Sequence, residues 1–135
     1  MNLTTAQASL LVQRLQEHVQ IHRDVEVVLA PNTLFLQPLS LQIDHRKFKL
    51  AAQDAYFKDE GAYTGQVSFT QLHGLVSYAI IGHSERRHIF GETLDETKLK
   101  VAAAYRNDIT PILCVGETKA EHIAGETNQV LHDQV

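Results

Sequence analysis

Several residue types and patterns are scarce in this 135-residue sequence, which has no tryptophan and only one cysteine. A single cysteine, Cys114, cannot form an internal disulfide, and this is typical of proteins in a reducing compartment such as the cytoplasm. No apolar run approaches the length of a membrane span, and the N-terminal residues lack the apolar core of a signal peptide. We therefore expect neither membrane insertion nor secretion.

The sequence also lacks an excess of basic residues. It has 12 Lys and Arg against 16 Asp and Glu, which gives a net charge of -4. Nucleic-acid-binding proteins usually carry a basic surface that neutralises phosphates, so no nucleic-acid partner is expected. Apolar residues make up 44% and charged residues 21% of the chain, an ordinary globular composition. The composition therefore indicates a cytoplasmic enzyme or binding domain.

Helical and strand-like patterns alternate along the chain. A helix over about 5–20 is predicted from the apolar positions Ala8, Leu11, Val12, Leu15 and Val19, preceded by capping-box spacing at 4–7. Further helices are predicted after Asn32, near Thr70, from 93 to about 107, and over 119–135. Strands are predicted at 25–30, 48–53, 77–81 and 110–115.

The predicted strands lack the polar alternation of a sheet with one solvent face. Continuous apolar strands are typical of a parallel sheet buried on both faces by helices. The fold class is therefore α/β, with about four βα units of parallel strands. With no linker or low-complexity segment in sight, residues 1–135 are expected to form a single domain.

Polar residues follow the predicted strands where each one ends. They are Asn32, Gln53, His83 with Glu85, and Glu117. Ligands of α/β folds bind at the carboxyl ends of the strands, so this edge is the predicted site. The polar, glycine-containing segment 54–68 is long for a connecting loop, which favours a functional or partner-binding role.

Five short segments together resemble one family. Residues 81–87, Ile-Gly-His-Ser-Glu-Arg-Arg, are similar to the signature around the catalytic histidine of triosephosphate isomerases. Residues 30–31 resemble the family's APP-type turn, 51–54 its AAQN with Asp54 where Asn is usual, 61–68 its GAFTGEVS, and 111–118 its PIxCxGE. The resemblance covers nearly the whole chain, in the family's order and spacing.

The resemblance implies a partial TIM (β/α)8 barrel. Family members have about 250 residues in eight βα units, and this chain corresponds to the stretch from after strand one to the helix after strand five. Residues 1–135 would then be a single partial (β/α)-barrel domain, incomplete at both ends. The family's substrate-binding lysine would lie before Met1, and its catalytic glutamate, lid and phosphate-binding loops beyond Val135. No substrate-binding residue is therefore assigned within the chain.

The resemblance also implies a chemistry. The family interconverts dihydroxyacetone phosphate and D-glyceraldehyde 3-phosphate in glycolysis and gluconeogenesis, through an enediolate and without metal or organic cofactor. Its histidine is a known example of a neutral imidazole electrophile, with a pKa lowered by a helix N-terminus. That role falls to His83, with Glu85 supporting the site and Ser84 contributing more weakly. The residues alone leave open a merely hydrogen-bonded His83, a solvated salt bridge at Glu85 and a helix cap at Ser84.

The segment 57–68 resembles the loop that this family inserts into a neighbouring subunit. Tyr63, Thr64 and Gly65 would then contact the partner of a homodimer, whereas the sequence alone would favour a surface loop. Arg86 and Arg87 are expected to be structural, and Glu92 to pair with an arginine. Cys114 is expected to be a buried packing group within a strand.

Three functional hypotheses follow. The first is a triosephosphate isomerase whose 135-residue stretch supplies the electrophile without the base, and which alone has little or no activity. The second is another phosphosugar isomerase on the same barrel. The third is a non-catalytic half-barrel that self-associates, because half a barrel leaves sheet edges unpaired and an apolar interior open.

Overall fold

The computed structural model describes residues 2–135, and its centre is one sheet of four parallel strands. The strands are β1 (Val27–Leu29), β2 (Phe48–Ala52), β3 (Tyr78–Ile81) and β4 (Thr110–Leu113), in the spatial order β1-β2-β3-β4. Each strand pairs in parallel with the next along the chain. The predicted α/β class and its four parallel strands are confirmed.

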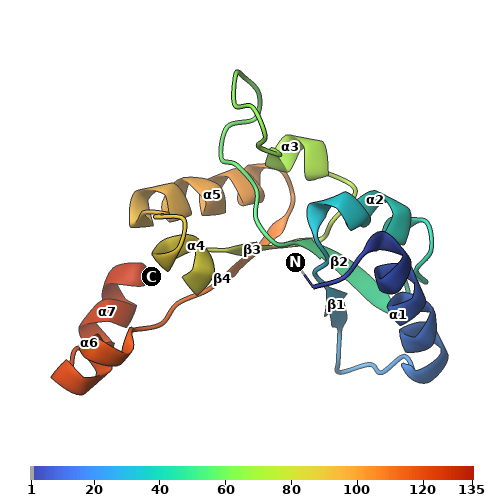
Figure 1. The fold of residues 1–135 in the computed structure, drawn as a ribbon, viewed down its shortest axis with the longest axis horizontal. Helices are drawn as coiled ribbons and strands as arrows, with labels where there is room; N and C mark the ends of the chain where they lie inside the picture. The colour runs from blue at the N-terminus through green and yellow to red at the C-terminus, as the bar shows by residue number, and fades with distance from the viewer. Residues whose placement is uncertain (1) are drawn as a thin grey trace.

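Seven helices precede, connect or follow these strands in the described part of the chain. They are α1 (Thr5–His18), α2 (Thr33–Ser40), α3 (Phe69–Leu72), α4 (Ser84–His88), α5 (Leu94–Arg106), α6 (Lys119–Ala124) and α7 (Thr127–Gln134). The predicted capping boxes are present at Thr4 and Thr93, whose hydroxyls accept from the backbone N–H three residues later. Figure 1 shows α1 and α2 beside β1 and β2, α4 and α5 beside β3 and β4, and α6–α7 extending away from the sheet.

The predicted helical stretch 119–135 is helical but is divided in two. Residues 119–135 do not form a single helix, because α6 ends at Ala124 and α7 begins at Thr127. Gly125 lies between them in the left-handed conformation, with φ of 77°, and its N–H bonds to the last carbonyls of α6. Glycine adopts this conformation without the steric cost that other residues pay, so it ends the helix here.

The two faces of the sheet differ in burial. Toward the helices, β2 and β3 present Phe48, Leu50, Ala79 and Ile81, all at most 2% exposed. These side chains join Val12 of α1, the apolar face of α2, and Ala103 and Ala104 of α5 in one core. Burying a side chain such as that of Phe48 contributes roughly 1.5–3 kcal/mol, so this face holds the units together.

The opposite face is only partly covered. The strand register places Tyr78 and Ile80 of β3 beside Thr110 and Ile112 of β4, and none of these four side chains is fully buried. The prediction that the strands are buried on both faces is therefore wrong for β1, β3 and β4, which all contain residues that are only half-buried or exposed. The reason is that the helices cover one face of the sheet alone, and Figure 1 shows the sheet open rather than closed into a ring.

Cys114 lies on this open side. It follows the last residue of β4 and is half-buried, so the expectation of a buried cysteine within a strand is wrong.

Within residues 2–135, no helix combines the length and the apolar composition that a membrane span requires.

Candidate active site at the carboxyl ends of the strands

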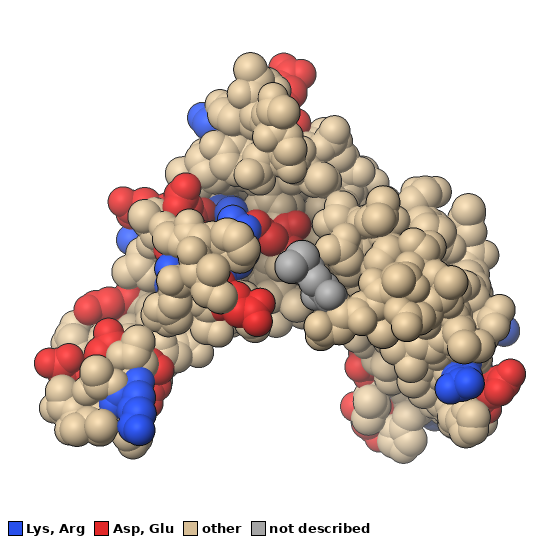
Figure 2. Space-filling model, in the orientation of Figure 1, with Lys and Arg blue, Asp and Glu red and all other residues tan. Residues whose placement is uncertain are grey.

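The parallel strands bring four chain segments to the same edge of the sheet. These segments begin at Ala30 after β1, Gln53 after β2, Gly82 after β3 and Cys114 after β4. Figure 2 shows Lys, Arg, Asp and Glu side chains gathered in the hollowed centre of this view, between the α4–α5 side and the α1–α2 side. Chemistry-bearing residues that are distant in the sequence are thus neighbours here.

His83 lies at the first turn after β3 and is the N-cap of α4. Its Nδ1 accepts a hydrogen bond from the backbone N–H of Glu85 at 3.3 Å. The Glu85 carboxylate lies 3.8 Å from the same nitrogen, which is too long for a hydrogen bond. We therefore favour the tautomer in which Nδ1 is unprotonated and Nε2 carries the hydrogen.

The outer nitrogen of His83 is available to a ligand. The side chain is 45% exposed, and within residues 2–135 Nε2 has no hydrogen-bond partner. An imidazole N–H held in place by a hydrogen bond to its other nitrogen can donate to a carbonyl oxygen and polarise it. This arrangement suits an electrophile.

Gly82 sets the direction in which His83 leaves the strand. Its φ is 70°, and a Cβ added there would lie 2.6 Å from Nη2 of Arg87 and 3.0 Å from Cγ2 of Thr97. Arg87 itself donates from Nε to the Gly82 carbonyl at 2.6 Å and from Nη2 to the Cys114 carbonyl at 3.0 Å. Arg87 therefore links the ends of β3 and β4 by hydrogen bonds, which is a structural role.

Ser84 and Glu85 follow His83 as the first residues of α4, and both are exposed. The alternative that Ser84 caps this helix is wrong, because His83 is the cap and Ser84 is already helical. The Glu85 side chain is 72% exposed, and its Oε2 lies 3.8 Å from Nδ1 of His83. Both side chains lie beside the histidine and are open to further contacts.

The other polar residues at the strand ends have local partners. Asn32 accepts from the N–H of Leu34 and caps α2, and Gln53 donates to the carbonyl of Ala30, which links β2 to β1. Glu117 accepts from His122 and Thr127. Hydrogen bonding from its own backbone N–H, and then from His122, lowers the pKa of Glu117. These three residues shape the site, whereas His83 and Glu85 remain open to solvent.

Glu92 follows α4 in the chain, and its buried carboxylate is paired with two cations. Its Oε2 lies 3.0 Å from Nε of Arg86 and 2.5 Å from Nζ of Lys100. Burial raises the pKa of Glu92, but hydrogen bonds from Lys100 and Arg86 outweigh burial and hold it below its ordinary value. The expected pairing of Glu92 with an arginine is confirmed, and Glu92 Oε1 is buried without a hydrogen-bond partner.

Lys100 is a residue that the sequence analysis missed. It lies on the buried face of α5 with Thr97, Ala103 and Ala104, and its side chain is 4% exposed. A lysine among buried residues at helical spacing indicates a buried carboxylate partner, because an unpaired ammonium is costly to bury. That signal was present in the sequence.

Tyr63, Thr64 and Gly65 are all exposed, in the loop before α3 that projects from the molecule at the top of Figure 1. The ring of Tyr63 packs at a tilt against the ring of Tyr56, with centroids 4.8 Å apart. The N–H of Gln66 bonds to the Tyr63 carbonyl and closes a turn. The projecting segment thus has a defined shape and presents an aromatic side chain.

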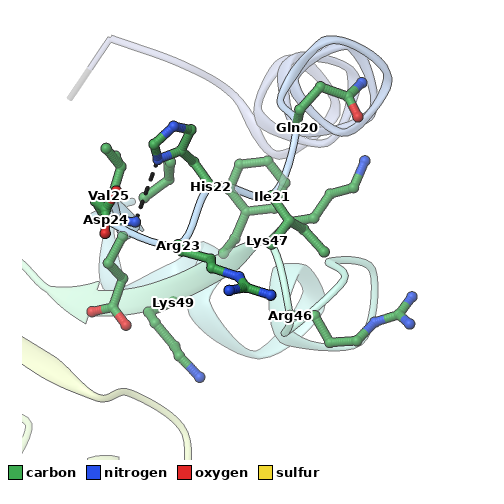
Figure 3. Close-up of a pocket in the computed structure, with 12 residues that line it drawn as sticks. Gln20, Ile21, His22, Arg23, Asp24, Val25, Arg46, Lys47 and Lys49 are labelled. Atoms are coloured by element: carbon green, nitrogen blue, oxygen red, sulfur yellow. Dashed lines mark hydrogen bonds between the residues drawn. The ribbon is translucent and has the colours of Figure 1, made fainter.

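A second hollow lies at the opposite edge of the sheet. It has a volume of about 430 Å³ and is lined by residues 20–27 and 46–49, which lead into β1 and β2 and include their first residues. Figure 3 shows its cationic side chains pointing in different directions rather than toward one point: Arg23, Arg46, Lys47 and Lys49. None of the predicted site residues lines it, so it is separate from the candidate site. Among residues 2–135, no three His, Cys, Asp or Glu side chains are grouped to hold a metal ion.

Comparisons with known proteins agree on one family. The model of the triosephosphate isomerase family matches residues 1–135. Curated proteins named triosephosphate isomerase are similar over the whole chain: one from Clostridium acetobutylicum is 42% identical over 136 residues, one from Synechocystis sp. 41% over 137, and one from Dehalococcoides mccartyi 38% over 135. The match covers 54%, 57% and 53% of those proteins, so the chain spans about half the length of the curated relatives it matches.

Proposed function

Because the chain belongs to the triosephosphate isomerase family, we propose that it carries the electrophilic half of an active site that interconverts dihydroxyacetone phosphate and D-glyceraldehyde 3-phosphate. The observation that carries the proposal is the placement of His83. Its Nδ1 accepts from the N–H of Glu85, its side chain is 45% exposed, and within residues 2–135 its Nε2 has no hydrogen-bond partner. In this proposal the protein acts in cytoplasmic glycolysis and gluconeogenesis, as part of a larger barrel.

The proposed mechanism begins with the carbonyl of the substrate. The Nε2–H of His83 donates to the carbonyl oxygen and stabilises the negative charge that develops there as a base removes the adjacent proton. The same imidazole then moves a proton between the two oxygens of the enediolate. Glu85 supports the site, and Ser84 adds a weaker contact. No residue of this chain is assigned as the base.

The test uses a chimera in which residues 1–135 replace the matched stretch of the Clostridium acetobutylicum relative. We expect the chimera to catalyse isomerisation of dihydroxyacetone phosphate, and the isolated 135-residue chain to show little or no turnover, since it lacks an assigned base. A coupled spectrophotometric assay measures both. A chimera that folds, as judged by circular dichroism and a cooperative melt, yet turns over no faster than the isolated chain would overturn the proposal.

We also propose that the complete protein is a homodimer in which Tyr63, Thr64 and Gly65 contact the partner. The exposed tip, the packing of the Tyr63 ring against Tyr56 and the turn at Tyr63 support this proposal. Two adjacent apolar side chains at the end of α4, Ile89 and Phe90, are 71% and 67% exposed and offer a surface beside the site for such a contact.

A second candidate function is a half-barrel that self-associates without catalysis. The observation that favours it is the sheet itself: within residues 2–135, β1 and β4 each pair on one side only, and the inner face is partly exposed. Light scattering of the isolated chain distinguishes the two. A defined soluble dimer favours the half-barrel, whereas polydisperse aggregate favours a piece of a larger barrel. A third candidate, another phosphosugar isomerase, predicts that the chimera prefers a different substrate.

A further inference from the structure

Four charged side chains form a closed ring beneath the candidate site. Asp54 Oδ1 lies 2.6 Å from Nζ of Lys100, and Asp54 Oδ2 lies 3.1 Å from Nε of Arg86. Glu92 contacts the same two cationic groups, at 2.5 Å and 3.0 Å. Each cation therefore touches both carboxylates, and the ring holds two charges of each sign.

Asp54 is the member of the ring that departs from the family resemblance, in which Asn is usual at this position. Lys100 and Glu92 are buried, with side chains 4% and 2% exposed, whereas Asp54 is 20% and Arg86 32% exposed. A neutral amide at residue 54 would leave two cations facing one carboxylate in a poorly solvated site. The carboxylate of Asp54 removes that imbalance, because buried charges are tolerated only when they are paired.

The ring joins three segments that approach the site separately. Asp54 follows β2 and begins the connection that leads to Tyr63. Arg86 belongs to α4, whose N-cap is His83, and Lys100 belongs to the long helix α5. Two charge-assisted contacts from one side chain therefore connect the start of the projecting segment to both helices that follow β3.

We propose that Asp54 is a positioning residue that fixes α4, and with it the imidazole of His83, relative to β2 and to the base of the segment 54–68. The importance of this position for catalysis rests on the proposed function, whereas the effect of Asp54 on the position of α4 does not. Asp54 acts through Arg86 and Lys100 and touches no reacting atom.

The test compares Asp54→Asn with Asp59→Asn in the chimera that carries residues 1–135 within the Clostridium acetobutylicum relative. Asp59 is a matched control, because it also belongs to the segment 54–68 and its carboxylate pairs with an arginine, Arg106 of α5, at 3.1 Å. Amide hydrogen exchange reports the local opening of each element, and the NMR signals of the His83 ring report its environment.

We expect Asp54→Asn to speed amide exchange about tenfold or more at Arg87 and Ile89, whose N–H groups donate to the carbonyls of His83 and Glu85. The same variant should also shift the NMR signals of the His83 ring. Exchange in β3 should change far less. Asp59→Asn should leave α4 and His83 unchanged. Exchange at α4 within twofold of the original in Asp54→Asn, or equal effects of the two variants, overturns the proposal.

A second variant keeps the proposal testable if Asp54→Asn does not fold. Arg86→Gln removes the link between Asp54 and α4 while Lys100 keeps both carboxylate partners, and it should loosen α4 and shift His83 in the same way. An unchanged His83 in that variant contradicts the proposal. No substrate is present in these measurements, so their outcome is independent of whether the protein is an isomerase.

Discussion

Replacing Lys100 with methionine is expected to lower the free energy of unfolding by about 3–5 kcal/mol, the usual cost of removing one partner from a buried ion pair. Methionine is unbranched and close to lysine in length, but it carries no charge. It leaves the carboxylates of Glu92 and Asp54 with Arg86 as their only cationic partner in the ring. Urea unfolding followed by circular dichroism measures the change.

Lys98→Met on the same helix is the matched control. Lys98 is exposed, and its contact with Asp95 is 4.0 Å long, so its loss should cost no more than about 1 kcal/mol.

The pKa of Glu92 is held below its ordinary value in the folded chain. The contribution of Glu92 to folding stability is therefore complete above the unfolded-state pKa of about 4.3 and is lost as the pH falls. The difference in the free energy of unfolding between Lys100→Met and the original chain should therefore become smaller below that pH. Equal stability of the two lysine variants at pH 7 would show that the ring contributes nothing.

Replacing His83 with glutamine in the chimera is expected to lower kcat by about 10²–10⁴-fold, the usual contribution of a positioned acid–base group. Glutamine can donate a hydrogen bond to the substrate carbonyl, but it cannot exchange protons between the oxygens of an enediolate. KM should change much less, because the lost interaction strengthens only as charge develops. Initial rates over a range of substrate concentrations separate the two effects.

His132→Gln serves as the control in the same chimera. His132 is exposed on α7, far along the chain from the strand ends, and its replacement should leave kcat within twofold. A His83→Gln chimera that retains more than a tenth of the original kcat would remove His83 from the role of electrophile.

The sequence was informative wherever local interactions decide the structure. Capping boxes at Thr4 and Thr93 start helices through contacts between residues three apart, and both are present. Apolar runs located all four strands. The order of strands also followed, since βα units place consecutive strands side by side. The edge that carries His83 could therefore be predicted from the sequence.

The features that were not predicted are of two kinds: contacts between residues distant in the sequence, and local sequence signals that were overlooked. The partners Asp54 and Lys100 are 46 residues apart, and no local pattern specifies such a pair. The same holds for the hydrogen bond from the Tyr78 hydroxyl to Glu26, which spans 52 residues across the open face. The helix break at Gly125 could have been predicted, because a glycine inside a helical pattern commonly marks the end of a helix. The exposure of β4 could not have been predicted, since it depends on which face of the sheet the helices cover.

The most direct measurement of the central claim is the infrared carbonyl stretch of dihydroxyacetone phosphate bound to the chimera. An electrophile that donates from Nε2 polarises the carbonyl and weakens its double bond, so the stretching frequency should fall below that of the free ligand. In His83→Gln the shift should become smaller. A bound carbonyl that absorbs at the frequency of the free ligand, or a shift that is unchanged in His83→Gln, would contradict the assignment of His83 as the electrophile.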